Sequence, residues 1–139
     1  MVREIVKDTD TLRSVSTKVN PTSADTKRVI KDLLDTATAH QDKCVGMAAI
    51  QIGEPVRIIV VSDGTSFIPY INPVITKYHG AKYTAQEGCV SLDGIRDVER
   101  YEAVEVMHQT TKGFVKFKCA GIMAEIMQHE VDHLNGKLI

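Results

Sequence analysis

The chain of 139 residues lacks several features that would place a protein in a particular class at once. No apolar stretch approaches the roughly 20 residues that a membrane-spanning helix needs. The N-terminus has neither the apolar run of a signal peptide nor an arginine-rich transit pattern. Basic and acidic residues nearly balance, 17 against 18, so no excess of charge indicates nucleic acid or anionic lipid as a partner. We therefore expect a soluble protein with no membrane association, whose ligand is not a polyanion.

Cysteine is also scarce. Cys44, Cys89 and Cys119 cannot all pair within the chain, and no Cys-x-x-Cys pair is present to build a closed structural metal site. Thiols that stay free fit a reducing compartment. We expect a cytoplasmic protein.

No internal repeat, low-complexity tract or linker divides the chain, and its length suits one domain, so we expect residues 1–139 to form a single domain. Periodicity, capping residues and turn residues predict helices and strands in turn. The expected helices span residues 8–16, 22–40 and 120–134, with Thr22 opening a capping box. The expected strands span residues 56–61, 66–71, 74–83, 98–108 and 114–119, with turns at Asp63-Gly64, Asn72-Pro73 and Thr111-Lys112-Gly113 and a break near Gly80. This order predicts an α+β fold of mostly antiparallel strands packed around the C-terminal helix, with an N-terminal helix.

The C-terminal helix carries a His-Glu-x-x-His motif, formed by His129, Glu130 and His133. Histidines four residues apart project from one face of a helix, so both imidazoles can reach the same metal ion. Ile122 and Ile126 fall on the same stripe, which points the histidines toward the core. A lone buried histidine is more often a hydrogen-bonded core residue, but the pair with its glutamate favours a metal site.

Two other segments contain residues that could serve such a site. Gln51 is the only amide in an apolar run of small residues, where it could satisfy a neighbouring backbone group. Cys89 follows Gly88 and, taken alone, is more typical of a small buried hydrophobe. It could also be a nucleophile, but a thiolate beside two histidines better completes a metal site with an open fourth position, where water can be acidified.

The three segments, in this order, resemble the signature motifs of the peptide deformylases: Gly-x-Gly-x-Ala-Ala-x-Gln, Glu-Gly-Cys-x-Ser and Gln-His-Glu-x-Asp-His. The second and third match in full, while the first departs at Cys44 and Ile50. The resemblance implies that Cys89, His129 and His133 bind one divalent metal ion. In bacterial relatives this ion is typically iron(II), and zinc, nickel or cobalt can substitute.

The same resemblance implies roles for the remaining site residues. Glu130 would be the general acid and base, and Gln51 with the backbone N–H of Val90 would bind the oxyanion. Gly46, Met47 and Gly88 would contact the substrate. The implied reaction removes the formyl group from the initiator methionine of nascent polypeptides and releases formate, so the expected partners are formyl-methionyl peptides and, transiently, the ribosome.

Two other functions remain open at this level. A catalytically weak deformylase-like protein could bind formyl-methionyl termini without turnover. A zinc endopeptidase shares the His-Glu-x-x-His motif but usually takes its third ligand from a downstream glutamate or histidine, and neither follows His133 in this sequence.

Overall fold

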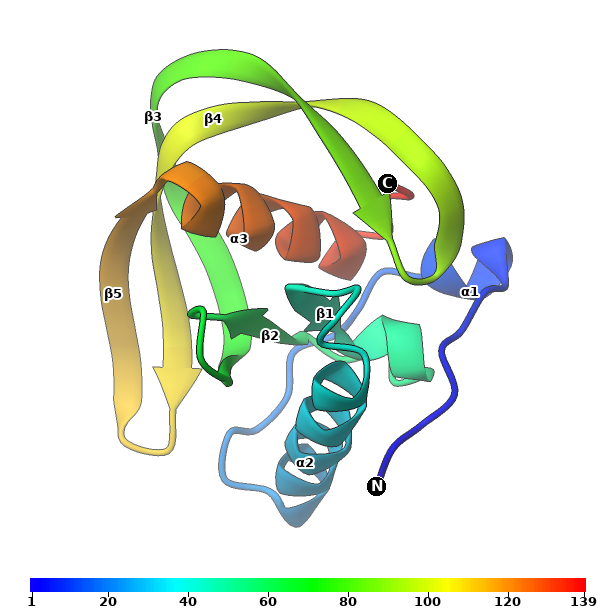
Figure 1. The fold of residues 1–139 in the computed structure, drawn as a ribbon. Helices are drawn as coiled ribbons and strands as arrows, with labels where there is room; N and C mark the ends of the chain where they lie inside the picture. Colours follow the sequence, from blue (N-terminus) through cyan, green and yellow to red (C-terminus); the bar gives the residue numbers. More distant parts are fainter.

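The computed structural model describes residues 1–139 and has the predicted α+β architecture (Figure 1). An antiparallel sheet has the strand order β1-β2-β3-β4-β5. The elements, in chain order, are α1 (Thr9–Leu12), α2 (Ala24–Ala39), β1 (Gly46–Ala48), the short 3-10 helix η1 (Ala49–Ile52), β2 (Ile58–Ser62), β3 (Phe67–Cys89), β4 (Leu92–Thr110), β5 (Gly113–Ala120) and α3 (Gly121–Leu134).

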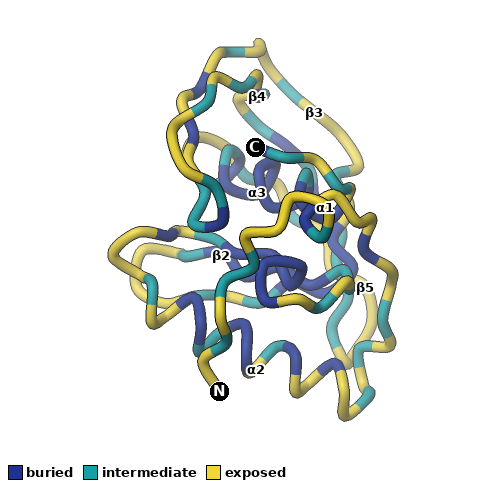
Figure 2. Tube along the Cα trace, turned by 90° about the vertical axis from the view of Figure 1, so that its right-hand side faces the viewer, coloured by how far each residue is buried: buried dark blue, intermediate teal, exposed yellow.

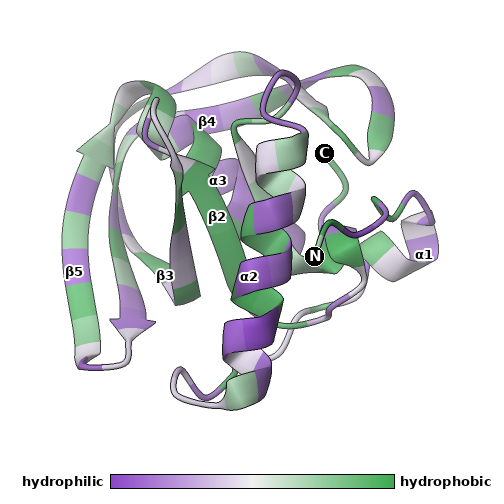
Figure 3. Ribbon diagram, turned by 60° about the horizontal axis from the view of Figure 1, so that its bottom comes forward, coloured by the Kyte–Doolittle hydropathy of each residue, from purple (hydrophilic) through white to green (hydrophobic).

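Helix α2 begins one residue later than the predicted capping box. Its N-cap is Ser23, whose hydroxyl oxygen accepts a hydrogen bond from the Thr26 backbone N–H at 3.1 Å. Thr22 instead donates its hydroxyl to Asn20 Oδ1 at 2.9 Å, so the prediction of Thr22 as the cap is wrong. The helix is amphipathic, with hydrophobic residues facing the sheet and hydrophilic residues facing outward (Figure 3).

Strand β2 separates two hydrophobic clusters. Because successive side chains of a strand point to opposite faces, Ile59 and Val61 pack with α3, whereas Ile58 and Val60 pack with α2. Both helices therefore bury one face against the same strand, which places β2 in the centre of the buried region (Figure 2).

Strands β3 and β4 form one long, irregular hairpin that arches over α3 (Figure 1). The predicted turn at Asn72-Pro73 is wrong, because β3 continues through it with a register shift between Ile71 and Val74. Asn72 adopts a φ of 51° there, and its side-chain amide donates to Val19 O at 2.8 Å. These features bend the strand without reversing it, and its end at Cys89 comes to lie beside α3.

Helix α3 buries most of its residues and ends at Leu134, two residues before Gly136. Ile122 departs from the predicted buried stripe, since it is 71% exposed at the first turn, while Ile126 is buried. Gly136 has a φ of 78°, which favours glycine after the helix end, as predicted. None of the helices combines the length and apolar character needed to cross a membrane.

Candidate functional site

Helix α3 and the end of β3 bring three potential metal ligands together. His129 and His133 lie one turn apart on α3, with their Nε2 atoms separated by 3.1 Å. Cys89 is the last residue of β3, and its Sγ lies 3.6 Å from His133 Nε2. The three ligand atoms all lie within 4.8 Å of one another. A cysteine and two histidines that follow it by 40 and 44 positions in the sequence thus form one cluster of a sulfur and two nitrogens.

The spacing of these atoms fits a single divalent ion. Bond lengths of about 2.3 Å to sulfur and about 2.0–2.1 Å to nitrogen would separate sulfur from nitrogen by about 3.6 Å and the two nitrogens by about 3.3 Å in a tetrahedral site. The separation of Cys89 Sγ from His133 Nε2 is 3.6 Å, and that of the two histidine nitrogens is 3.1 Å. Three protein donors leave one coordination position open, which is typical of catalytic sites.

Glu87 fixes the orientation of one histidine. Its Oε1 accepts a hydrogen bond from His129 Nδ1 at 2.8 Å, which leaves His129 Nε2 free to face the cluster. Although burial opposes ionisation, the bonds from His129 and Arg100 lower the pKa of Glu87 to about 2. Glu87 is therefore a carboxylate, and it holds the tautomer that metal binding needs.

A buried arginine supports this carboxylate. Arg100, on β4, donates to both oxygens of Glu87 at 3.0 and 2.7 Å and to Asp132 of α3 at 2.7 Å. Neither Glu87 nor Arg100 was predicted from the sequence to be a functional residue. Glu87 lies within the second motif, which was the only available signal, while nothing in the sequence around Arg100 distinguishes it from other arginines.

Gln128, inside the third motif, has a structural role. Its side-chain amide exchanges two hydrogen bonds with the backbone of Tyr101, accepting from the N–H at 2.9 Å and donating to the carbonyl at 3.0 Å. This pairing mimics a neighbouring strand and anchors α3 to β4, so the two histidines are held at a fixed distance from the sheet.

Gln51 lies beside the cluster on η1 and is 1% exposed. Its Oε1 accepts from the Ala48 backbone N–H at 2.9 Å, which directs the amide nitrogen toward Cys89 Sγ and Ser91 Oγ, each 3.2 Å away. The side chain therefore satisfies a backbone group, as one reading of the sequence suggested, and also aims a hydrogen-bond donor at the site.

Glu130 is also buried at the site. It is 3% exposed, and its Oε1 has no hydrogen-bond partner in the chain. Burial raises the pKa of its carboxyl to about 7. A group that titrates near neutral pH can both accept and return a proton, which suits a general acid and base.

Gly46 allows β1 to lie close to α3. A Cβ atom added to Gly46 would lie 2.8 Å from Glu130 Oε2 and 2.9 Å from Ile126 Cγ2, which is closer than such contacts allow. Only glycine at this position leaves the Glu130 carboxyl where it is, between the strand and the cluster.

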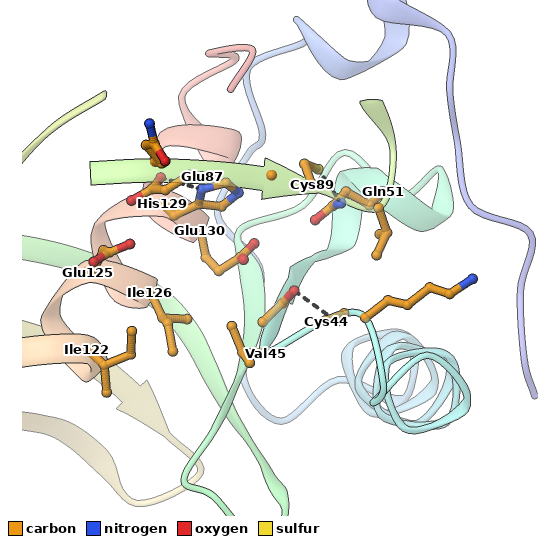
Figure 4. A pocket seen from close by; sticks show the side chains of 15 residues that line it. Cys44, Val45, Gln51, Glu87, Cys89, Ile122, Glu125, Ile126, His129 and Glu130 are labelled. Atoms are coloured by element: carbon orange, nitrogen blue, oxygen red, sulfur yellow. Dashed lines mark hydrogen bonds and ion pairs between the residues drawn. The ribbon is translucent and has the colours of Figure 1, made fainter. Parts of the chain in front are cut away.

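A cavity of about 200 Å³ joins these residues (Figure 4). Gly46, Gly88 and Val90 line it. The Val90 N–H, in the turn between β3 and β4, makes no hydrogen bond within the chain. It is therefore free to serve as a second donor beside Gln51.

Met47 lies elsewhere. It is fully buried in the cluster that packs against α2, and it is absent from the residues that line the cavity. Side chains alternate along β1, so Gly46 faces α3 while Met47 points to the opposite face of the sheet. The expectation that Met47 contacts the substrate is corrected by this geometry.

The two departures from the first motif are core residues. Cys44 is buried and its Sγ donates to Gly46 O at 3.1 Å, and burial raises the pKa of the thiol to about 12. Ile50 is 1% exposed in the cluster under α3. Neither residue displaces Gln51 from the site.

Comparison with known proteins identifies close relatives along the whole chain. Residues 2–139 match the family model for polypeptide deformylase. The peptide deformylase of Clostridium beijerinckii is 40% identical over 141 residues, covering 100% of both chains. That of Dictyoglomus turgidum is 36% identical and covers 100% of this chain and 91% of its own length.

Solved structures agree with these matches. The peptide deformylase of Thermotoga maritima superposes with a TM-score of 0.89 at 31% identity, covering 99% of this chain and 95% of the other. A class I type b peptide deformylase from Acinetobacter baumannii, bound to Met-Ala-Ser, gives 0.88 at 30% identity, covering 99% and 96%. Matches in sequence and in structure thus extend over the same, nearly complete chain, and the chain belongs to the polypeptide deformylase family.

Proposed function

We propose that Cys89, His129 and His133 bind one divalent metal ion, and that the chain hydrolyses the N-formyl group of formyl-methionyl peptides. The observation that carries the proposal is the grouping of the three donor atoms within 4.8 Å of one another. Cys89 and His129 line the same cavity as Glu130 and Gln51, so the groups needed for amide hydrolysis meet in one space.

Glu130 moves the proton in this reaction. When bound, the ion acidifies a water molecule and polarises the formyl carbonyl. The Glu130 carboxylate takes one proton from this water as the water oxygen bonds to the formyl carbon. It then gives the proton to the amide nitrogen as the carbon–nitrogen bond breaks, because an amine departs poorly as its anion. The products are formate and a peptide with a free amine.

Gln51 and Val90 stabilise the negative charge that develops on the formyl oxygen. The Gln51 amide nitrogen is already aimed at the site, and the Val90 N–H has no competing acceptor. Donors that are fixed before the reaction begins stabilise the developing charge without reorganisation.

Strand β1 offers a place for the peptide backbone. It is the edge strand of the sheet, so an extended peptide could pair with those of its outer N–H and C=O groups that Gln51 and Cys44 do not already bind. Gly46 on β1 and Gly88 near the end of β3 line the cavity from two elements. A substrate strand bound here would run between them, with its formyl end at Cys89.

The proposal extends to the ion and the cellular setting. We take iron(II) as the native ion on the basis of the motif resemblance; a thiolate and two imidazoles also suit zinc, nickel and cobalt. The substrates would be nascent chains, met in the cytoplasm with transient contact to the ribosome. No observation favours a zinc endopeptidase or a binding module without turnover.

The proposal is tested by measuring formate release from formyl-Met-Ala-Ser, using anaerobically purified protein and metal analysis of the same sample. We expect turnover that depends on one equivalent of bound metal. Full metal occupancy without formate release would contradict the proposal and indicate a binding module instead.

A further inference from the structure

One wall of the cavity combines apolar residues with a carboxyl group. Ile122, Ile126 and Glu125 follow one another along α3, and Val45 faces them across the cavity (Figure 4). Glu125 takes no part in binding the metal or moving the proton. Its position at the wall therefore needs another explanation.

Glu125 is only partly satisfied within the chain. It is half-buried, and its Oε1 accepts a hydrogen bond from Tyr83 Oη at 3.1 Å. Its side chain forms no ion pair, unlike Glu87, which is bonded to Arg100. Burial and a hydrogen bond with the Glu87 carboxyl raise the pKa of Glu125, and a cation placed beside Glu125 would favour its ionised form.

The position of Glu125 relative to the reacting group follows from the helix. Glu125 precedes His129 by four residues and so lies on the same face, about 6 Å further along the helix axis. The first side chain of a formyl peptide starts three bonds from the formyl carbon, close to His129. A straight side chain of four or five atoms that passes Ile126 and Val45 would therefore end near Glu125.

We propose that Glu125 is a specificity-determining residue of this cavity. Its carboxylate lets the cavity accept, besides methionine, long first side chains that end in a cationic hydrogen-bond donor, with lysine as the representative. The inference rests on the proposed function for the position of the formyl group. It concerns only the wall of the cavity that would contact the first side chain of the peptide.

The physical reason is a contrast between two ends of otherwise similar side chains. The methylenes of lysine and norleucine contact the same apolar residues, Val45, Ile122 and Ile126. The lysine ammonium then donates to Glu125, whereas the methyl end of norleucine removes water from the carboxylate and returns no hydrogen bond. A carboxylate at this wall thus favours binding of the lysine side chain and disfavours binding of the norleucine side chain.

The test compares formyl-Lys-Ala-Ser with formyl-Nle-Ala-Ser on metal-loaded protein, using kcat/KM from formate release. Glu125→Gln keeps the shape and removes the charge, so we expect the lysine-to-norleucine ratio to fall about 10-fold, the scale for one partly exposed charge pair. Glu125→Leu should lower the ratio further and raise kcat/KM for formyl-Met-Ala-Ser.

The matched control is Glu99→Gln, which removes an exposed carboxylate of β4 that lies outside the cavity. We expect this variant to leave the ratio unchanged. A Glu125→Gln protein with the wild-type ratio would overturn the inference, since the carboxylate would then not contact the first side chain.

Measurements of peptide binding distinguish a failure of this inference from a failure of the proposed function. The dissociation constants of the same two peptides, measured by calorimetry, give the same ratio without turnover. A protein that binds the peptides with a Glu125-dependent ratio but releases no formate would contradict the proposed function and support the role of Glu125. Equal binding of both peptides by wild type and Glu125→Gln would overturn that role whatever the turnover.

Discussion

At the residue scale, Glu130 combines deep burial with an unpaired oxygen, which is unfavourable unless the carboxyl has a partner in the working site. Glu130→Gln keeps the shape and removes the proton carrier. We expect normal folding, near-normal metal content and a fall in kcat of about 100-fold to 10,000-fold, the usual contribution of a positioned acid and base. Steady-state kinetics and metal analysis of the purified variant check this.

A different result would reassign Glu130. If Glu130→Gln loses its metal but recovers full activity when metal is added back, Glu130 only supports the ion, and another group carries the proton.

Gln51 combines its hydrogen bond to the backbone with the proposed donor role, and a substitution separates the two effects. Gln51→Ala would remove the proposed donor to the formyl oxygen, so kcat should fall about 100-fold to 1,000-fold with a smaller change in KM. It also leaves the buried Ala48 N–H without its acceptor, which should cost about 1–3 kcal/mol of unfolding free energy. Kinetics and urea unfolding on the same protein measure both effects. Loss of stability with a normal kcat would show that Gln51 is only a structural amide.

At the scale of elements, Arg100 joins three pieces of the fold. It lies on β4 and binds Glu87 of β3 and Asp132 of α3, and Glu87 in turn orients His129. Arg100→Met leaves the buried Glu87 carboxylate without its cation. We expect a loss of about 3–5 kcal/mol in unfolding free energy, the scale for breaking one side of a buried pair. Metal affinity should also weaken by about 10-fold to 100-fold, because His129 loses its fixed orientation.

The control for this prediction is Lys82→Met, which breaks an exposed ion pair with Glu99 between the same two strands. It should change the unfolding free energy by less than about 1 kcal/mol and leave metal affinity alone. Denaturant unfolding and competition with a metal chelator measure the two quantities. Equal effects of the two variants would show that Arg100 has no special part in the site.

At the scale of the whole molecule, the two hydrophobic clusters share β2, so neither can open without exposing the other face of that strand. We therefore predict that residues 1–139 unfold as one cooperative unit, with equal calorimetric and van't Hoff enthalpies. A metal ion held by Cys89, His129 and His133 would join the end of β3 to α3. At a free concentration 100 times its dissociation constant, nickel should add about 2.7 kcal/mol and raise Tm by about 10 °C.

Two cysteine variants test whether the nickel-dependent rise in Tm requires Cys89. Cys89→Ala should unfold at the same Tm with and without nickel, because two histidines alone hold the ion weakly. Cys44→Ser should keep the nickel-dependent shift, since Cys44 is a buried thiol bonded to Gly46. Two separate transitions in the wild-type protein would contradict a single domain.

Much of this protein was predictable because the relevant signals are local. Helix α3 and its histidine pair follow from a spacing of four residues, and the hairpin at Asp63-Gly64 from turn residues between β-branched runs. The three motifs, read in order, indicated the family. Each of these signals depends on neighbours within a few residues, so sequence alone determines it.

Tertiary structure decided the rest. Whether Gly46 or Met47 faces the cavity depends on the register between β1 and β2, and the bend at Asn72 depends on its hydrogen bonds to Val19, 53 residues away in sequence. The Arg100 network and the Glu125 wall also form only where β3, β4 and α3 meet. Contacts of this kind arise from the packing of distant elements, which local periodicity and propensity do not encode.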